Sequence, residues 1–413
     1  MEIKILGSGR EVGKSAILVS DKKTDIVMDY GVKLQPEPPT YPIRPNKIDA
    51  AILTHAHLDH SGGLPILHKK WRKPLFMNTV TLELIEMLVS DSIKIARKEG
   101  YSIPFSKNDL RRMIKNTKIV NYNEQFRVGD FNCSLYDSGH IPGSSSILLE
   151  NKKRIFYTGD IQTVDSNLLR ACRLPDKADV LITESTYSYK DHPKKEGEEE
   201  RFLASIEESM ANEEFALVPV FAVGRAQEVL LILEKYANKI ALDGMAKGAS
   251  ELIASYGSYL RDAKRFKKIL GKVHWVKTRE ERERALKRYP IILSSAGLLG
   301  GGPIVHYLRE IKHKPESKVI FTGFLIEDTP GANLIQTKIF ENSEEKFKVH
   351  CKLEQYDMSA HTDRTGLFGI IEKLKPSQVV CVHGEKCEEF AFDIEQKFGI
   401  SAVAPKNGET IRV

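Results

Sequence analysis

The chain has 413 residues, of which 41% are hydrophobic and 29% charged, a balance that excludes an intrinsically disordered protein. Its length exceeds the size at which one hydrophobic core normally stops growing, so we expect two domains, and its net charge of +6 is compatible with a polyanionic partner. No run approaches the roughly 20 apolar residues that cross a bilayer, and residues 1–6 alternate like a strand instead of forming a secretion signal, so we expect a cytoplasmic protein with no membrane partner.

The first part of the chain has the pattern of a layered α/β domain. Short strand-like segments separated by Gly, Asp and Lys turns are predicted at residues 1–6, 16–19, 25–28 and 50–53. Residues 79–98 then have apolar side chains at helical spacing, which predicts an amphipathic helix. Strands are predicted again at residues 118–120, 131–136, 146–149, 154–157 and 180–183. Helices between strands indicate an α/β fold.

The pattern changes after residue 187. Residues 191–201 are rich in Lys and Glu and are expected to be an exposed crossing into a second unit. From residue 198 to about 348, helices alternate with short apolar strands, which is typical of a parallel α/β domain. Strand-like segments that contain His reappear at residues 349–355 and 378–382, where we expect the first domain to resume. We therefore predict one domain from residues 1–188 and 350–413, with residues 189–349 as an insertion.

The densest group of metal-ligand side chains is Thr54-His55-Ala56-His57-Leu58-Asp59-His60, directly after the strand predicted at residues 50–53. In an extended turn His55 and His57 can point the same way, because side chains alternate with a period of two. Asp59 and His60 then reach a neighbouring position. Zinc prefers imidazole nitrogen and carboxylate oxygen at about 2.0–2.2 Å. The alternative is histidines that are satisfied by hydrogen bonds on a polar turn, and it requires a separate explanation for each of the four groups.

Further ligand-type residues follow later strands, each beside a glycine. They are His140 in Ser138-Gly139-His140 and Asp160 in Thr158-Gly159-Asp160. Either would be ordinary alone, but their order after the histidine cluster strengthens the prediction of a metal site. A carboxylate such as Asp160 can bridge two cations, and two metals about 3.5–4 Å apart form a clamp for displacement at phosphorus.

Residues 7–15 end like a phosphate-binding Walker A loop, but Ser8 stands where that motif requires glycine, so a P-loop nucleotidase is disfavoured.

The five cysteines are scattered without a Cys-x-x-Cys pair, which argues against a disulfide framework and against a cysteine-based zinc site.

The histidine and aspartate motifs at residues 54–60, 138–140 and 158–160 resemble those of the metallo-β-lactamase superfamily. Asp29 matches the first acidic motif of that superfamily. The later segments narrow the resemblance: Glu184 in Thr183-Glu184-Ser185-Thr186-Tyr187, His361 in Ser359-Ala360-His361-Thr362-Asp363 and His383 in Val382-His383-Gly384-Glu385 are similar to motifs A, B and C of the β-CASP nucleases. That group contains the 3′-end mRNA-processing endonuclease and the ribonuclease J enzymes. Residues 221–228, and residues 294–297 with 300–303, look like loops of the β-CASP insert. The resemblance covers essentially the whole chain and implies a metallo-β-lactamase αββα sandwich with an inserted α/β β-CASP domain.

The resemblance also implies a centre of two zinc ions per chain. One ion is assigned to His55, His57 and His140, the other to Asp59, His60 and His383, and Asp160 bridges them. Asp29 is expected to orient ligands without binding metal, the alternative being an aspartate that caps a turn.

The catalytic pair implied by the resemblance is His361 and Glu184, which act beside the ligand Asp59. His361 is the general acid that protonates the leaving oxygen, and Glu184 fixes its imidazole and favours the charged form. Arg225 and Ser359 are candidate substrate contacts, although an arginine at the position of Arg225 is also compatible with an ordinary surface salt bridge.

The resemblance implies a zinc-dependent ribonuclease of RNA processing or decay that acts on single-stranded RNA. We expect endonucleolytic cleavage, with 5′-to-3′ exonuclease action at the same site as an open second activity. A histidine at the third motif, here His383, is the pattern of the RNA-cleaving members. The alternatives are a DNA nuclease or small-molecule metallohydrolase with the same two metals, and a non-catalytic RNA-binding subunit. A homodimer and protein partners in RNA processing are left open.

Overall fold

The computed structural model describes residues 1–35 and 38–413, and these residues fold into two compact units. Unit 1 comprises Met1–Asp165, Ala171–Asp191 and His361–Val413. Unit 2 comprises Ser166–Arg170 and His192–Ala360. Most of unit 2 is therefore inserted in the sequence of unit 1.

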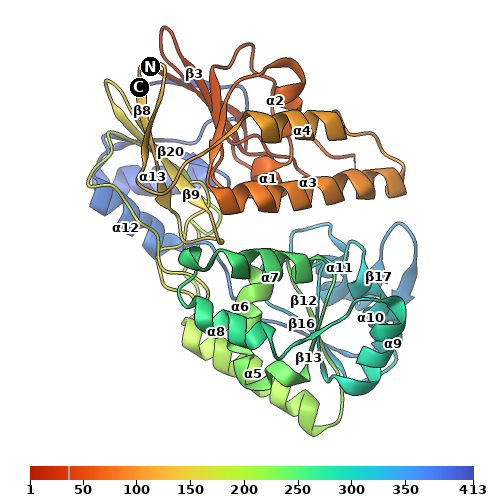
Figure 1. Cartoon of the computed structure of the whole chain (residues 1–413). Helices are drawn as coiled ribbons and strands as arrows, with labels where there is room; N and C mark the ends of the chain where they lie inside the picture. Colours follow the sequence, from red (N-terminus) through yellow and green to blue (C-terminus); the bar gives the residue numbers. More distant parts are fainter. Residues whose placement is uncertain (36–37) are drawn as a thin grey trace. The chain divides into compact units, whose positions relative to one another are not determined.

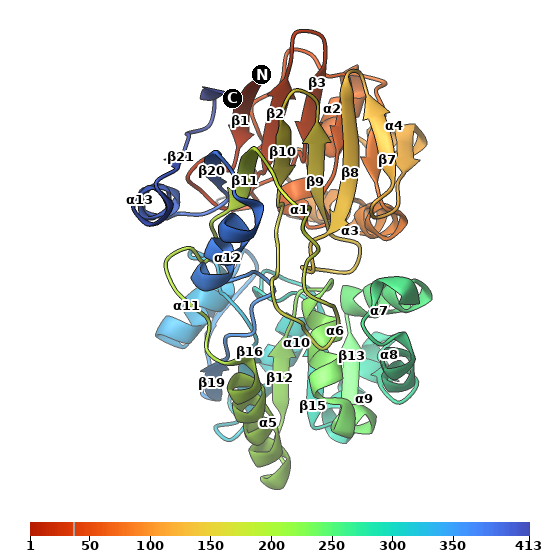
Figure 2. The same ribbon diagram turned by 90° about the vertical axis from the view of Figure 1, so that its left-hand side faces the viewer.

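Unit 1 contains a sheet in the order β22-β1-β2-β3-β4-β5-β6 and another in the order β21-β20-β11-β10-β9-β8-β7. The strands of the first sheet are β1 (Glu2–Gly7), β2 (Ala16–Ser20), β3 (Asp25–Met28), β4 (Ala50–Ile52), β5 (Leu75–Met77), β6 (Thr117–Ile119) and β22 (Thr410–Arg412). Those of the second sheet are β7 (Gln125–Val128), β8 (Phe131–Asp137), β9 (Ser145–Glu150), β10 (Arg154–Tyr157), β11 (Val180–Glu184), β20 (Gln378–Val382) and β21 (Ser401–Val403). Figure 2 shows β7 to β11 side by side in this order.

The core of unit 1 lies between these sheets because alternate side chains of each strand point to the same face. Ile3 and Ile17 from the first sheet pack in one buried cluster with Phe131 and Leu135 from the second. Helices cover the outer faces, so Figure 1 shows the layers in the order helices, sheet, sheet, helices. This arrangement confirms the predicted αββα sandwich. The helices are α1 (Leu58–Ser61), α2 (Leu64–Lys70), α3 (Thr79–Glu99), α4 (Lys107–Asn116), α12 (Arg364–Leu374) and α13 (Cys387–Phe398).

Helix α3 confirms the amphipathic helix that the apolar spacing predicted. Asn78 caps its first turn by accepting a hydrogen bond from the backbone N–H of Thr81. Gly100 ends it in the left-handed conformation that glycine adopts without strain. Buried apolar residues occupy one face, among them Leu84, Ile85 and Val89.

Unit 2 is built on a parallel sheet in the order β14-β13-β15-β12-β16-β19. Its strands are β12 (Ala216–Pro219), β13 (Ile240–Asp243), β14 (His274–Trp275), β15 (Ile291–Ser294), β16 (Lys318–Phe321) and β19 (Lys352–Gln355). Its helices are α5 (Lys195–Ala211), α6 (Arg225–Ile232), α7 (Met245–Ser255), α8 (Ala263–Leu270), α9 (Arg279–Arg288), α10 (Pro303–Ile311) and α11 (Pro330–Thr337). β17 (Ile339–Glu341) and β18 (Lys346–Lys348) form a separate antiparallel pair. The alternation of helices with parallel strands confirms the α/β pattern expected of the insert.

The return to unit 1 differs from the expectation. Residues 349–355 were assigned to the resumed first domain, but β19 pairs in parallel with β16, from Lys318↔Lys352 to Phe321↔Gln355, inside the sheet of unit 2. Unit 1 resumes at His361. The sequence of a short strand indicates a strand but does not say which sheet it joins, so this boundary could not be read from the pattern.

Among the described residues, no helix combines the length and the apolarity that spanning a membrane requires.

One buried histidine of unit 1 makes stability depend on pH. His68 in α2 is 2% exposed, and neither of its ring nitrogens has a hydrogen-bond partner among the described residues. Burial lowers the pKa of His68 from 6.5 to about 4. The pKa of His68 is lower in the folded protein than in the unfolded one. The folded state therefore loses stability as the pH falls below about 6.5, and the loss is complete below about 4.

We expect His68→Leu to remove this dependence, which amounts to on the order of 3 kcal/mol between neutral pH and pH 4. The measurement is urea unfolding of wild type and variant at a series of pH values. His313→Leu is the control, because His313 is exposed and its loss should leave the pH dependence unchanged. Parallel pH profiles for wild type and His68→Leu would contradict this account.

Candidate metal centre

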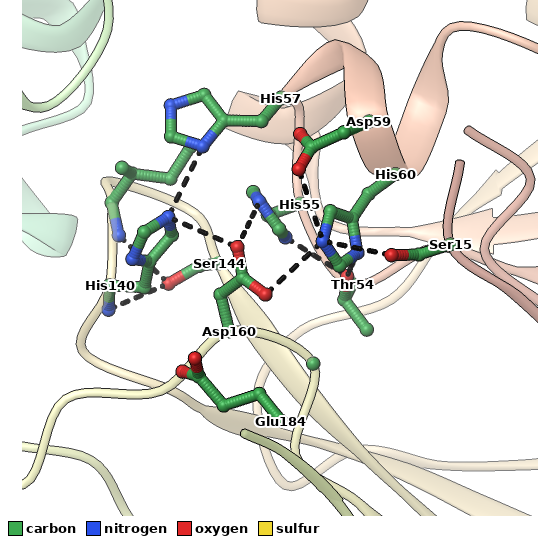
Figure 3. A network of polar contacts seen from close by, with 12 residues as sticks. Ser15, Thr54, His55, His57, Asp59, His60, His140, Ser144, Asp160 and Glu184 are labelled. Atoms are coloured by element: carbon green, nitrogen blue, oxygen red, sulfur yellow. Dashed lines mark hydrogen bonds and ion pairs between the residues drawn. The ribbon is translucent and has the colours of Figure 1, made fainter. Parts of the chain in front are cut away.

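The seven predicted metal ligands gather at one edge of unit 1, because each follows the end of a strand. The parallel pairs β10–β11 and β11–β20 align the ends of β10 and β20, and β8 runs in the same direction because β8 and β10 are both antiparallel to β9. β4 belongs to the other sheet, and its end lies beside them, as the contact between His55 and Asp160 shows. The turn from β4 into α1 supplies His55, His57, Asp59 and His60, and the segments after β8, β10 and β20 supply His140, Asp160 and His383. Figure 3 shows the side chains of the turn together with His140 and Asp160.

The ligand atoms form overlapping groups, in each of which they lie within 4.8 Å of one another. One group is His55, His57, His140 and Asp160, and another is Asp59, His60, Asp160 and His383. These are the sets that the resemblance assigns to one zinc ion and to the other, with Asp160 in both.

The carboxylate of Asp160 lies between these groups and turns one oxygen towards each (Figure 3). Its Oδ2 is 3.4 Å from Nε2 of His55 and 3.6 Å from Nε2 of His140. Its Oδ1 is 3.1 Å from Nε2 of His60 and 3.7 Å from Nε2 of His383. One carboxylate can therefore serve ligand sets on both sides.

The chemistry of the donors fits cations of the zinc type. Nε2 of His55 and Nε2 of His57 are buried, and neither has a hydrogen-bond partner within the described part of the chain. Burial holds the pKa of His55 well below its usual value, so its imidazole is neutral, which is the form that binds metal. Burial opposes the charge of Asp160, but His60 and His383 outweigh it and hold the pKa of Asp160 well below its usual value. A neutral imidazole such as that of His55 and an ionised carboxylate such as that of Asp160 are donors that zinc prefers.

Asp29 lies behind His60 on the side away from Asp160. Its Oδ2 is 2.7 Å from Nδ1 of His60, and it accepts hydrogen bonds from Thr54 N, Thr54 Oγ1 and Tyr157 OH. These contacts fix the ring so that its other nitrogen, Nε2, faces Asp160. A carboxylate behind a ligating histidine also makes the imidazole a stronger donor.

Sequence reasoning missed Ser15, which stands just before β2. Its Oγ lies 2.8 Å from Nδ1 of His383 and 3.3 Å from Nε2 of His60. The loop before Ser15 also holds His383, since the backbone N–H of His383 donates to the carbonyl of Ser8. The pattern of residues 7–15 drew attention only as an imperfect Walker loop. No spacing rule connects Ser15 with a partner 368 positions away.

We expect Ser15→Ala to weaken zinc binding about tenfold without unfolding unit 1, because His383 loses the group that orients its ring. Zinc affinity is measured by competition with a chromophoric chelator. Ser134→Ala is the control, since Ser134 is also buried but lies in β8. Equal zinc affinity of Ser15→Ala and wild type would show that the contact is not needed.

His361 and Glu184 form a pair beside Asp160. Nδ1 of His361 is 2.8 Å from Oε2 of Glu184, and Nε2 of His361 is 4.0 Å from Oδ2 of Asp160. Glu184 is held in place by hydrogen bonds from the N–H of Ile161 and the hydroxyl of Thr186. Burial favours the neutral imidazole, but the carboxylates of Glu184 and Asp160 outweigh it and raise the pKa of His361 to about 9. His361 therefore carries a proton at neutral pH.

The predicted substrate contacts Arg225 and Ser359 both belong to unit 2. Arg225 is the first residue of α6, and its guanidinium lies close to Gly323, which follows β16. Ser359 is partly exposed. Their role as substrate contacts remains a prediction.

Comparison with known families gives matches over most of the chain. Residues 226–334 match the Beta-Casp domain, and residues 346–405 match the Zn-dependent metallo-hydrolase RNA specificity domain. Residues 1–192 match the model of the anti-Pycsar protein Apyc1.

Among curated proteins, the chain is 38% identical to the probable RNase MJ4 of Methanocaldococcus jannaschii, with all of both chains covered. It is 32% identical to RNase aCSPSF2 of Saccharolobus solfataricus, over 99% of this chain and 85% of that one. It is also 32% identical to the transcription termination factor FttA of Pyrococcus abyssi, over 99% of this chain and 70% of that one. A crystal structure of a protein of unknown function from Enterococcus faecalis is similar in fold, with a TM-score of 0.62 and 16% identity over 99% of both chains.

Proposed function

The chain belongs to the β-CASP family of metallo-β-lactamase-fold ribonucleases, and from this premise we propose that it hydrolyses phosphodiester bonds of single-stranded RNA at a centre of two zinc ions. The observation that carries the proposal is the position of Asp160, whose two oxygens face different groups of ligand atoms. We propose that His55, His57 and His140 hold one ion, that Asp59, His60 and His383 hold the other, and that Asp160 bridges them.

Zinc ions bound here supply Lewis acidity, which polarises a phosphoryl oxygen and makes water acidic enough to attack at neutral pH. Protonation of the leaving oxygen is the task of the protein's own side chains. His361 holds a proton on its imidazole, and its Nε2 lies beside Asp160 at the centre. Donation of that proton to the leaving oxygen avoids the release of an unstable alkoxide. Glu184 keeps the ring in place and charged.

RNA is favoured over other substrates by the names of the relatives and of the matched domain, which refer to RNases and to RNA specificity. A small-molecule hydrolase with the same metals would not need an insert of the size of unit 2. A non-catalytic RNA-binding subunit is disfavoured, because the residues of the ligand groups and the Glu184–His361 pair are all present. We propose mainly endonucleolytic cleavage in RNA processing or decay, with 5′-to-3′ exonuclease action at the same site.

The test is incubation of the purified chain and zinc with labelled single-stranded RNA and with DNA of the same sequence. We expect RNA to be cleaved faster, and a chelator to stop the reaction. Faster loss of the DNA would overturn the choice of substrate. Mapping the product ends of 5′-labelled RNA, with and without a 5′ monophosphate, separates internal cleavage from exonuclease action.

A further inference from the structure

Positive charge in this chain is concentrated in one stretch, residues 261–288. The stretch has twelve Lys or Arg residues and four Asp or Glu residues, which gives it a net charge of +8. The whole chain has 62 Lys or Arg and 56 Asp or Glu, so the other residues share 50 and 52 and are slightly acidic. The net charge of +6 therefore comes entirely from this stretch, which indicates a localised anionic partner.

The stretch forms one edge of unit 2. It contains α8, the edge strand β14 and α9. Figure 1 shows α8 and α9 on opposite sides of the sheet of unit 2, so the basic residues extend around its edge. Among the described residues, β14 pairs with β13 alone.

Helix α8 presents its lysines on one exposed face. Lys264, Lys267 and Lys268 have the spacing i, i+3, i+4, which places them side by side, and Lys272 follows just beyond the end of the helix. All four are exposed, and in the described part of the chain none of their side chains has an ion pair or hydrogen bond. The opposite face of the helix is buried through Phe266, Ile269 and Leu270. Like charges that are adjacent and unpaired repel one another, and a polyanion relieves this repulsion.

An open hollow of about 680 Å³ lies beside β14 and is lined by side chains that include Lys247, Glu251, His274, Trp275, Lys277 and Glu281. The indole N–H of Trp275 donates to the carbonyl of Leu270 and so holds the ring in place. His274 stacks on Tyr289 with ring centres 4.6 Å apart and planes 8° apart. Fixed aromatic rings beside lysines are the combination with which proteins bind single-stranded nucleic acid, because bases stack on the rings while cations hold the phosphates.

We propose that this edge of unit 2 is an additional RNA-binding surface, on which Lys264, Lys267, Lys268 and Lys272 hold the phosphates of single-stranded RNA and the hollow at Trp275 accepts a base. The choice of RNA over other polyanions rests on the proposed function. Binding by this surface is independent of sequence and depends steeply on salt.

The test uses the full chain with zinc in a His361→Ala background, in which labelled RNA survives long enough for equilibrium binding. In one variant Lys264, Lys267, Lys268 and Lys272 are all changed to glutamine, and in another all four are changed to arginine. The matched control changes Lys22, Lys23, Lys152 and Lys177 to glutamine, which removes the same charge. These lysines are also exposed and precede β3, β10 or β11, whereas the metal ligands follow the strands.

Fluorescence anisotropy of a labelled single-stranded RNA is recorded over a range of salt concentrations. We expect the α8 glutamine variant to bind about tenfold more weakly near 0.1 M salt, and the slope of log affinity against log salt to fall by about 2 to 3. The arginine variant keeps the charge and is expected to bind like the unchanged surface, as is the control.

If the glutamine variant has the same RNA affinity and the same salt dependence as the unchanged surface, the proposed RNA-binding role of α8 is wrong. An equal loss in the control would also overturn it, because the effect would then come from net charge alone. The proposed function is tested separately by RNA cleavage with the unsubstituted chain. If the chain cleaves RNA but binds it normally without the four lysines, the proposed function stands and the proposed binding surface is wrong. If the chain binds RNA through α8 but does not cleave it, the binding surface stands and the proposed function is wrong.

Discussion

Replacing Asp160 by asparagine is expected to lower the zinc content below two ions per chain and to slow RNA cleavage about 10³-fold. The reason is the position of this carboxylate. Each of its oxygens faces imidazole nitrogens of a different ligand group, at 3.1 to 3.7 Å. The amide keeps the shape but supplies no negative charge and only one oxygen. In the proposed assignment one ion would therefore lose its Asp160 oxygen, and the other would keep only a neutral oxygen in place of a charged one.

Zinc is counted by elemental analysis after dialysis, and cleavage is followed under single-turnover conditions. Asp130→Asn is the matched control, because Asp130 is an exposed carboxylate in the β7–β8 turn of the same unit. An Asp160→Asn protein with two zinc ions and normal cleavage would refute the bridging assignment. Loss of zinc in the control as well would point to general instability.

The residue types of this centre could be predicted from the sequence, because metal chemistry uses few donors and several of them are adjacent. The turn at residues 54–60 follows directly from a buried strand, and His140 and Asp160 follow later strands beside glycines. Strands that run in the same direction within a sheet end at the same edge, whatever their distance in the sequence, and β8 and β10 do so. A tight local motif and a general rule of sheet geometry were sufficient for these positions.

Other features depend on packing that no local pattern records. Asp29 and His383 both adopt left-handed backbone conformations, with φ of 58° and 51°, which non-glycine residues rarely adopt and which the surrounding contacts must enforce. Ser15 supports His383 from the opposite end of the chain. The orientation of Asp160, with Oδ2 towards His55 and Oδ1 towards His60, depends on residues that are far apart in the sequence. β19 belongs to unit 2 because it pairs with β16, and the sequence of β19 does not indicate which strand it pairs with.

His361→Ala is expected to slow cleavage by about 10²- to 10⁴-fold while the zinc content stays at two ions per chain. His361 differs from the ligands in its contacts. Its Nδ1 is engaged by Glu184 at 2.8 Å, and its Nε2 is 4.0 Å from the nearest oxygen of Asp160. The ring is thus placed to deliver a proton and not to complete a ligand group. Loss of zinc from His361→Ala would mean that this residue binds metal, and the carboxylates near it would then form a third ligand group with it.

Glu184→Gln tests whether the carboxylate acts through His361. Burial alone would lower the pKa of His361, and Glu184 is the largest of the influences that raise it to about 9. Removal of that charge lowers the pKa, so the protonated form is lost at lower pH and the alkaline limb of the rate profile shifts to lower pH. A purely structural role would reduce the rate at every pH and leave the limb where it was. Glu372→Gln, at an exposed position of α12, is the control and should change neither the rate nor the profile.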